Sequence, residues 1–392
     1  MQRTGIVGIG KMGISHLAIA SAHPELDVVA VCDSQPLMLS GVRSHLDLAT
    51  YRDVDKMLDD ADLDCLFVAT PTRSHAALAT EAMERGVGVF VEKPLTLSSA
   101  ESRRLAALAA DRRVANQVGY HNRFIGTFQE VARLVGAGAI GRVHHVDGKA
   151  FGQVVTQAKG GGRTWRAQKS EGGGCLHDYA CHVVDLMNFV VGPPERVIGS
   201  RLASIYSTDV EDAVYAIFDY PDGMTGTLET NWSDPTYRKM TTTITVHGEK
   251  GKIFADRQEC RLWLRDGASF ETFGPGWTIR YITDLQEPVR YYLRGEEYSA
   301  QVDRFATSVT RRDPNGENSF SSASDADQVV EEIARVNGDA GGRSISSLVG
   351  APAGMSNADM LRSVASDLST RATAVARRAV RLGRSTLDRR GR

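Results

Sequence analysis

A glycine-rich turn near the N-terminus restricts the fold of this 392-residue chain more than any other feature of its sequence. The turn has the spacing G-x-G-x-x-G at Gly8, Gly10 and Gly13, and it separates a short apolar run, residues 4–9, from a helical stretch that ends at Pro24. Glycines at such a strand-to-helix turn let the backbone approach a pyrophosphate, whose charge interacts with the amides and dipole of the helix N-terminus. The layout therefore predicts the beginning of a dinucleotide-binding α/β domain; the alternative is a structural turn without a ligand.

An acidic residue stands at the distance that this kind of site requires. A second apolar run, residues 28–32, ends in Asp33, which lies 20 residues after the last glycine of the turn. A carboxylate there accepts hydrogen bonds from the adenosine ribose hydroxyls and repels a 2′-phosphate, and no arginine follows before Arg43. The sequence therefore favours NAD over NADP, with Lys11 and Met12 of the turn beside the cofactor.

Strand and helix patterns alternate through the rest of the first 120 residues. Apolar runs at residues 66–69 and 88–91 enclose a helical stretch, residues 75–85, and this alternation is typical of a doubly wound parallel sheet. Ligands bind such a sheet at the carboxyl ends of its strands. The residues that directly follow these strands are therefore candidates for cofactor binding: Thr70, Pro71, Glu92 and Lys93.

A different pattern begins near residue 121. After a helix expected at residues 124–135, β-type runs follow one another with turn signals and few helices between them. We therefore expect a Rossmann domain over residues 1–120 and a second, α+β domain over residues 121–345, built on a large, mainly antiparallel open sheet. The β-type runs are residues 142–155, 196–206, 212–220, 224–232, 241–247 and 251–264.

One helix of the second domain carries ionisable residues behind a glycine triplet. The triplet at residues 172–174 precedes a helix expected at residues 177–191, in which Asp178 and His182 are four residues apart and so share one face. A carboxylate in that position can orient an imidazole and raise its basicity, as a general base requires. The alternative interpretation is an ordinary ion pair on a helix surface.

Cysteines and histidines in the same helix raise the question of a metal. Cys175, His177 and Cys181 lack the spacing of paired zinc ligands, and His177 and Cys181 fall on the other face of the helix from Asp178 and His182. We therefore expect no metal site in this helix, but buried thiols and a surface histidine.

These motifs together resemble the glucose–fructose oxidoreductase/inositol dehydrogenase (Gfo/Idh/MocA) family over about residues 1–345. The resemblance rests on the glycine fingerprint, the Ala69-Thr70-Pro71 turn, His75, Glu92-Lys93-Pro94 and the glycine triplet, and it adds His75 to the residues expected to bind the cofactor. It implies metal-free, NAD(P)-dependent oxidation or reduction of a sugar, inositol or sugar nucleotide, and a late helix packed against the first domain. It also implies a homodimer or homotetramer formed through open sheet faces. Ala180 stands where the family often has glycine, a modest departure in mid-helix.

Oxidation of a secondary alcohol by NAD needs a base for the hydroxyl proton and a positive group for the developing alkoxide. We expect His182 and Lys93 to supply these groups, and Asp178 to position His182 or to bind a neighbouring hydroxyl. Lys93 precedes a proline, which favours an extended backbone, and partial burial is expected to lower its pKa. Which of the two takes the proton stays open, and the alternative for Lys93 is a solvated loop residue.

Further polar residues are candidates for the substrate pocket. Tyr120, Asn122 and Arg123 follow the last strand of the first domain, where the family has a comparable segment. Trp165 and Arg166 lie in a Gly/Lys-rich loop that we expect to close over the substrate. The basic residues of that loop, Arg163, Arg166 and Lys169, either hold a phosphate or carboxylate, or are simply solvated.

Composition and charge exclude several other classes of protein. Lys plus Arg (46) and Asp plus Glu (48) nearly cancel, so no chain-wide basic field favours nucleic acid. Five cysteines without a C-x-x-C pair favour a reduced, cytoplasmic protein. Because no apolar run approaches roughly 18 residues, we expect no membrane span.

The C-terminal residues form a separate segment. Residues 346–392 have the pattern of a linker and an amphipathic helix, and residues 352–392 hold nine Arg and three Asp, a net charge of +6. The tail could associate weakly with an anionic membrane surface, but we favour a partly disordered tail or a helix packed on a sister subunit. Two alternatives for the whole chain are an NAD-retaining sugar-modifying enzyme without net redox and a non-catalytic nucleotide-binding sensor or scaffold.

Overall fold

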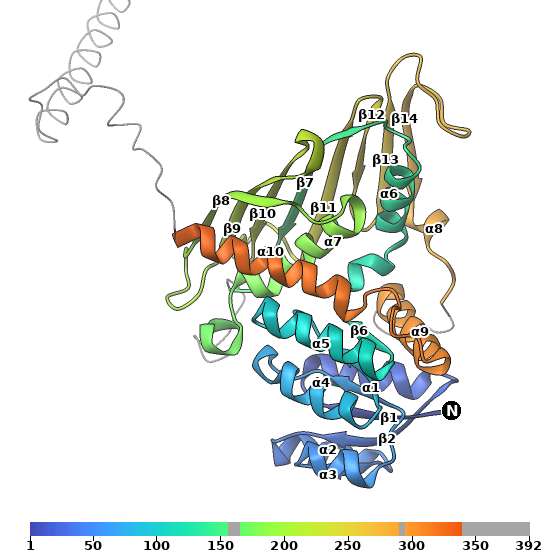
Figure 1. The fold of residues 1–392 in the computed structure, drawn as a ribbon, viewed down its shortest axis with the longest axis vertical. Coiled ribbons are helices and arrows are strands. Elements are labelled where there is room, and N and C mark those ends of the chain that lie inside the picture. The colour runs from blue at the N-terminus through green and yellow to red at the C-terminus, as the bar shows by residue number, and fades with distance from the viewer. Residues whose placement is uncertain (156–164, 290–294, 339–392) are drawn as a thin grey trace, which may run out of the picture. The chain divides into compact units, whose positions relative to one another are not determined.

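The computed structural model of the chain describes residues 1–155, 165–289 and 295–338. The basic segment at residues 346–392 and Arg163 lie outside these ranges, so the expectations for them stay predictions. The described residues form two large sheets with their helices (Figure 1). Because residues up to 340 group into one compact unit, the expected border at residue 120 also stays a prediction.

The first sheet is parallel throughout and has the strand order β3-β2-β1-β4-β5-β6. The order reverses between β1 and β4, and the glycine turn follows β1 at this switch point, where open α/β sheets bind ligands. The strands are β1 (Gln2–Val7), β2 (Leu26–Cys32), β3 (Ala49–Tyr51), β4 (Cys65–Val68), β5 (Gly88–Val91) and β6 (Asn116–Val118). The helices are α1 (Lys11–Ala22), α2 (Pro36–His45), α3 (Val54–Asp60), α4 (His75–Glu84) and α5 (Ser99–Arg112).

Two separate cores form on the two faces of this sheet, which explains why its central strands are apolar without alternation. Every residue of β4 and β5 is buried. Phe67 and Phe90 pack on one face together with Phe305, whereas Leu66 and Val89 pack on the other. The predicted doubly wound parallel sheet is therefore confirmed.

The second sheet is mainly antiparallel, as predicted, with the order β14-β13-β12-β11-β7-β10-β9-β8 and a single parallel pair, β10 with β7. Helices α6 (Gly126–Gly136), α7 (Cys181–Val191) and α10 (Phe320–Gly338) pack on one face (Figure 1). Side chains that alternate to the other face include large exposed apolar groups on β9, β13 and β14. The strands are β7 (Val143–Phe151), β8 (Arg196–Ala203), β9 (Ala213–Asp219), β10 (Thr225–Asn231), β11 (Thr241–Gly248), β12 (Gly251–Ala255), β13 (Glu259–Leu264) and β14 (Gly276–Tyr281).

One predicted strand is in fact two. The run at residues 251–264 breaks into β12 and β13, because Asp256 Oδ1 accepts hydrogen bonds from the backbone N–H groups of Gln258 (2.7 Å) and Glu259 (3.0 Å). An aspartate that bonds its own backbone two residues on forms a tight turn. β14 was not predicted, because the exposed Trp277, Ile279 and Tyr281 alternate on it without a buried apolar set.

Late helices connect the two sheets. α10 packs against α5 of the first sheet and against β8 and α7 of the second, and α9 (Glu296–Arg311) packs against α1 and the short helix η2 (His121–Phe124). Two carboxylates of α10 bind the start of α5: Asp327 Oδ2 accepts from Ser102 Oγ at 2.6 Å, and Glu331 Oε2 accepts from the Ser99 N–H at 2.9 Å. These contacts fix the segment that directly follows Lys93.

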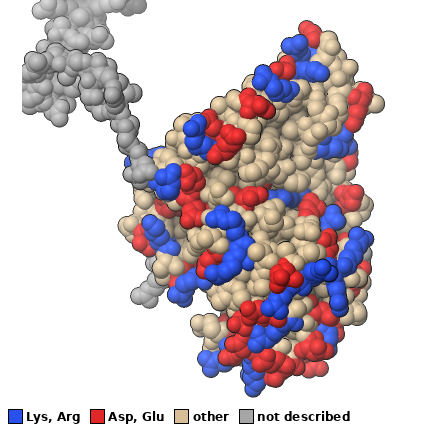
Figure 2. Space-filling model, viewed as in Figure 1, with Lys and Arg blue, Asp and Glu red and all other residues tan. Residues whose placement is uncertain are grey.

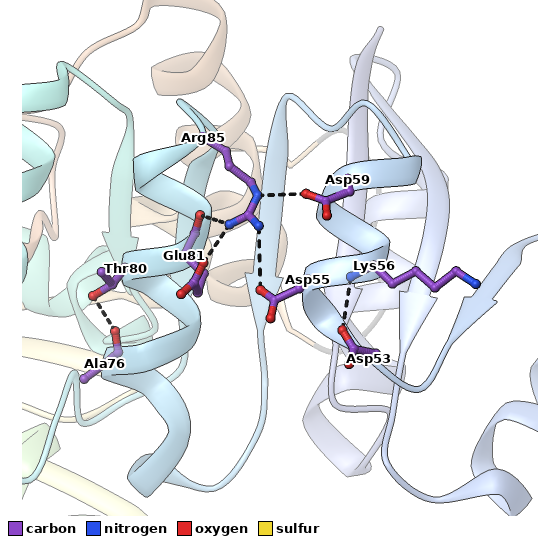
Figure 3. Close-up of polar contacts among 8 residues, drawn as sticks. All are labelled: Asp53, Asp55, Lys56, Asp59, Ala76, Thr80, Glu81 and Arg85. Carbon is purple, nitrogen blue, oxygen red and sulfur yellow. Dashed lines mark hydrogen bonds and ion pairs between the residues drawn. The ribbon is translucent and has the colours of Figure 1, made fainter.

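Charged groups on the surface are arranged in small mixed clusters. Figure 2 shows acidic and basic side chains interspersed over the face in view. One such cluster joins α4 to α3, where Arg85 pairs with Glu81 (2.7 Å), Asp59 (3.2 Å) and Asp55 (3.8 Å) (Figure 3). Exposed pairs of this kind contribute little to stability. Among the described residues, no helix has the length and apolar character to cross a bilayer.

Candidate active site

The glycine turn is held by backbone contacts that a side chain would prevent. A Cβ on Gly13 would lie 1.7 Å from the Gly8 carbonyl oxygen, and a Cβ on Gly8 (φ +86°) would lie 2.7 Å from that of Ala69. In contrast, a Cβ on Gly10 would meet no atom within 4 Å. The turn is therefore packed where it touches the protein and open in front of the N-terminus of α1, which fits a pyrophosphate.

Asp33 lies against the same turn, at the end of β2. Its Oδ2 accepts a hydrogen bond from the Ile9 N–H at 2.7 Å, and its Oδ1 accepts from the Gln35 N–H at 2.8 Å. A carboxylate has about four acceptor positions, so ribose hydroxyls can still donate to this half-exposed group. On the first turn of α1, Lys11 is exposed and Met12 is half-buried.

His75 joins the two predicted strand-end segments to one another. Its Nδ1 lies 3.0 Å from the Pro94 carbonyl oxygen and its Nε2 lies 3.0 Å from that of Thr70, so either neutral tautomer can donate to one of the two carbonyls. The Thr70 hydroxyl accepts from Ser74, and Pro71 precedes the first turn of this segment. Burial lowers the pKa of His75. His75 thus contacts both the segment that follows β4, at Thr70, and the segment that follows β5, at Pro94.

Glu92 connects α1 to the segment that carries Lys93. Its Oε1 lies 2.7 Å from His16 Nε2, and its Oε2 lies 3.3 Å from the backbone nitrogen of Lys93. Burial alone would raise the pKa of Glu92, but the hydrogen bond and charge of His16 hold it below its ordinary value. Sequence reasoning missed His16; its only signal is a histidine on the apolar side of the cofactor helix.

Lys93, Asp178 and Arg166 form a largely buried ion triad. Lys93 Nζ donates to Asp178 Oδ1 and to the Asp178 carbonyl oxygen, both at 2.8 Å, and Arg166 Nε donates to Asp178 Oδ2 at 3.0 Å. Burial alone would raise the pKa of Asp178, but Lys93 and Arg166 hold it at about 2. The predicted helix containing Asp178 and the strand-end lysine are thus brought together across 85 residues of sequence.

The expectation that burial lowers the pKa of Lys93 was wrong. Burial does oppose the charge of the ammonium, but the Asp178 carboxylate outweighs it and raises the pKa above the ordinary lysine value. The expected pairing of Asp178 with His182 is also absent among the described contacts. Both Asp178 oxygens accept from cationic donors, Lys93 and Arg166, which bind a carboxylate more strongly than a neutral imidazole does.

The helix that carries these residues begins with one turn of π-helix, η5 (Leu176–Ala180), before α7, and not as the regular helix predicted at residues 177–191. π-turns are frequent at functional sites. His182, on the first turn of α7, is buried, and burial together with the charges of Lys93 and His121 holds its pKa well below the ordinary value. A neutral imidazole and a cationic ammonium therefore lie within electrostatic reach of one another.

The predicted pocket residues differ in what they can offer a ligand. Asn122 is 1% exposed, and within the described structure neither atom of its amide has a hydrogen-bond partner, so the amide fits a bound polar group. Trp165 is half-buried, with the Arg166 guanidinium 4.8 Å from its ring centre. The other two are committed to protein partners: Tyr120 lies 3.4 Å from Asp327 Oδ1, and Arg123 forms a two-pronged pair with Asp185 (2.6 and 3.0 Å).

The cysteines are buried and free, as expected. His177 is half-buried and not the surface residue predicted; burial lowers its pKa, and its carbonyl accepts from the Cys181 thiol at 3.0 Å. No group of three potential metal ligands occurs in the described ranges.

Comparison with known proteins finds matches to two family models, one after the other along the chain. Residues 2–120 match the model of the oxidoreductase family with an NAD-binding Rossmann fold, and residues 128–254 match the GFO/IDH/MocA C-terminal domain. Inositol 2-dehydrogenase of Rhizobium meliloti (strain 1021) is 25% identical over 340 residues, 85% of this chain and 97% of that protein. Levoglucosan dehydrogenase of Pseudarthrobacter phenanthrenivorans is 28% identical over 64% of this chain and 72% of its own. A 2,7-anhydro-N-acetylneuraminate hydratase of Escherichia coli (strain K12) is 26% identical over 69% and 71%.

Solved structures share the fold over most of the chain. Levoglucosan dehydrogenase in complex with NADH and L-sorbose gives a TM-score of 0.76 at 22% identity, covering 86% of this chain and 98% of that one. GenD2 from gentamicin A biosynthesis, in complex with NAD, gives a TM-score of 0.71 at 25% identity, covering 86% and 94%. With both domain models matched in order, the chain belongs to the Gfo/Idh/MocA family of NAD-binding oxidoreductases.

Proposed function

We propose that the protein is an NAD-dependent dehydrogenase that oxidises a secondary hydroxyl of a sugar, an inositol or a related polyol. The observation that carries the proposal is a cationic Lys93, held by Asp178, within electrostatic reach of a neutral, buried His182 beside the strand ends of a nucleotide-binding sheet. The substrate class is supported by relatives named inositol 2-dehydrogenase and levoglucosan dehydrogenase.

The residues of the first sheet are proposed to hold the cofactor. The open space at Gly10 and the N-terminus of α1 receive the pyrophosphate, and Asp33 accepts from the ribose hydroxyls. When bound, NAD supplies the hydride acceptor. Thr70, Pro71 and the Glu92-Lys93 segment line the strand ends next to it, and His75 supports them.

The directions of two pKa shifts support one division of roles in proton transfer. His182 is neutral near pH 7, so its imidazole can accept the hydroxyl proton, whereas Lys93 keeps its own proton and stabilises the developing alkoxide. Asp178 orients the ammonium through its 2.8 Å contact and so acts on Lys93, not on His182. Asn122, Trp165 and Arg166 are the proposed substrate contacts; Tyr120 and Arg123 support the pocket from its interior.

Two variants and a control test this function. NADH formation is measured at 340 nm with a panel of inositols and sugars, and Lys93→Met and His182→Ala are each expected to lower kcat by about 100-fold or more, the size of a general-base or electrostatic contribution. Lys56→Met removes an exposed lysine of α3 and should leave the rate unchanged. Near-normal rates in both site variants would refute the proposal.

A reaction without net redox is the second candidate, because one relative is named a hydratase. In that case the hydride returns to the substrate and NADH does not accumulate. Substrate loss, followed by chromatography, would then proceed without growth of the NADH absorbance. The same two variants would abolish it.

We also propose a homodimer or homotetramer formed through the open face of the second sheet. Exposed apolar groups there include Tyr215 and Ile217 on β9, Trp263 on β13, and Trp277 and Ile279 on β14. Large apolar groups gathered on one face mark an interaction site more often than a solvated surface. The five free thiols and an NAD-linked activity favour a cytoplasmic enzyme.

A further inference from the structure

His182 lies in a column of four rings that come from three segments of the chain. Its ring centre is 5.9 Å from that of Tyr120, edge to face at 82°, and 4.8 Å from that of His121 at 46°. His121 in turn lies 4.9 Å from Tyr298 at 41°. Tyr120 and His121 are consecutive residues at the start of η2, His182 lies on α7 and Tyr298 on α9, so the column also connects the two sheets.

The column takes the place of the hydrogen bond that usually orients a catalytic imidazole. Such a base is commonly fixed by a carboxylate or carbonyl at its second ring nitrogen. Here both Asp178 oxygens are bound by Lys93 and Arg166, and His182 Nδ1 is buried with no hydrogen-bond partner in the described structure. The orientation of the ring must therefore come from packing, and His121 makes the shorter of its two ring contacts.

We propose that His121 is a positioning residue for His182: its ring fixes the plane of the His182 imidazole, and its positive charge, when present, opposes a second charge on that imidazole. The catalytic meaning of this contact rests on the proposed function of His182 as the base. The contact itself is a property of the folded chain and can be measured without turnover.

The charged groups around the pair favour this assignment. His182 faces the ammonium of Lys93 from the end of β5 and the imidazole of His121 from η2, and both oppose its protonation in addition to burial. Behind Tyr120 lies Asp327 of α10, which is held by Ser102 and Thr96. The carboxylate of Glu92 interacts electrostatically with His121. Glu92 is hydrogen-bonded to His16, so it is not available to His182.

Two variants separate the ring from its charge. His121→Phe keeps an aromatic ring in the column and removes the titratable group, whereas His121→Ala removes both. The full-length protein, labelled with ¹⁵N-histidine, is titrated by NMR without cofactor or substrate, and the His182 signals are identified by their loss in His182→Gln.

The expected outcome differs for each variant. In the wild type His182 titrates well below the ordinary histidine pKa, and in His121→Phe its titration moves to higher pH with one tautomer retained. In His121→Ala it moves likewise and the tautomers mix, because the ring is no longer held. Unchanged titration and a single tautomer in both variants would overturn the inference, and His121→Phe alone can decide if His121→Ala does not fold.

Kinetics provide a second readout that a merely structural role would not change. His121→Ala is expected to lower kcat by about tenfold with KM little affected, since a mis-set base slows proton transfer more than binding. In His121→Phe the acidic limb of the rate profile moves to higher pH, and the exposed His144→Ala serves as a control without effect.

The two proposals fail in different ways. A shifted NMR titration without any dehydrogenase activity would contradict the proposed function and leave this inference standing. Activity with an unshifted titration would overturn only this inference.

Discussion

The glycine turn and the ion cluster around Lys93 are built in opposite ways. The turn consists of backbone atoms in close contact, where a Cβ on Gly13 would lie 1.7 Å from the Gly8 carbonyl, and it faces open space at Gly10. The cluster consists of buried charged side chains, Lys93 and Asp178, whose protonation depends on one another. A backbone site is therefore sensitive to volume and insensitive to pH, whereas the side-chain site is expected to respond to single charges.

The largest effect is expected at the turn. Gly13→Ala places a methyl group onto the Gly8 carbonyl, so the turn must open; we expect loss of NAD binding by at least about 100-fold and a lower melting temperature without NAD. Gly10→Ala is the matched control, because its methyl group meets no protein atom: folding stays normal while NAD affinity falls by about tenfold. Calorimetric titration with NAD would contradict the account if Gly13→Ala bound like the wild type.

Removal of one charge from the cluster is the next largest change. Asp178→Asn deprives Lys93 of its counter-ion, so burial and the Arg166 charge lower the pKa of Lys93. We expect kcat to fall by about 100-fold, with activity lost further as the pH rises and the ammonium is deprotonated. The pH profile of kcat checks this, with the exposed Asp55→Asn as control. An unchanged alkaline limb would show that Asp178 does not hold the charge of Lys93.

A third prediction concerns stability, at the carboxylate that supports the cluster. Burial raises the pKa of Asp327 from 3.8 to about 7. The folded state thus retains a proton that the unfolded state loses, so stability is lost as the pH rises from about 4 through 7, by about 4 kcal/mol at most. Asp327→Asn should remove this pH dependence of the free energy of unfolding in urea. A wild type equally stable at pH 5 and pH 8 would refute it.

The smallest effect is expected for charge that is not buried. Arg85→Ala removes the pairs with Glu81, Asp59 and Asp55 on the surface of α3 and α4 (Figure 3). Because solvent screens these groups, the melting temperature and the rate should not change measurably. A clear loss of melting temperature or rate would contradict the account, because it would mean that exposed charges matter as much as the buried charges around Lys93.

The cofactor half could be predicted from sequence because its determinants are local. Glycine spacing, the acid at the end of β2 and the strand ends all follow from contiguous residues whose periodicity is set by the backbone. For the ion cluster around Lys93, the sequence predicts the residues but not which of them contact one another. Which partner Asp178 takes depends on Lys93, 85 residues away, and the pairing of Arg123 with Asp185 depends on the packing of η2 against α7.

The residues missed by sequence reasoning have the same explanation. His16 and His121 act through neighbours that only the fold supplies, Glu92 and His182. The break between β12 and β13 was missed because Asp256 is one polar residue in an otherwise β-type run, and its effect comes from two short hydrogen bonds to its own backbone.

The most direct test of the account is the pH dependence of kcat/KM for NAD reduction, measured with the fastest polyol of the panel in the wild type, His182→Gln and Lys93→Arg. If His182 is the base and Lys93 the fixed cation, the acidic limb disappears from the residual activity of His182→Gln and persists in Lys93→Arg. An acidic limb that survives in His182→Gln and disappears in Lys93→Arg would contradict the assignment and give the proton to the lysine.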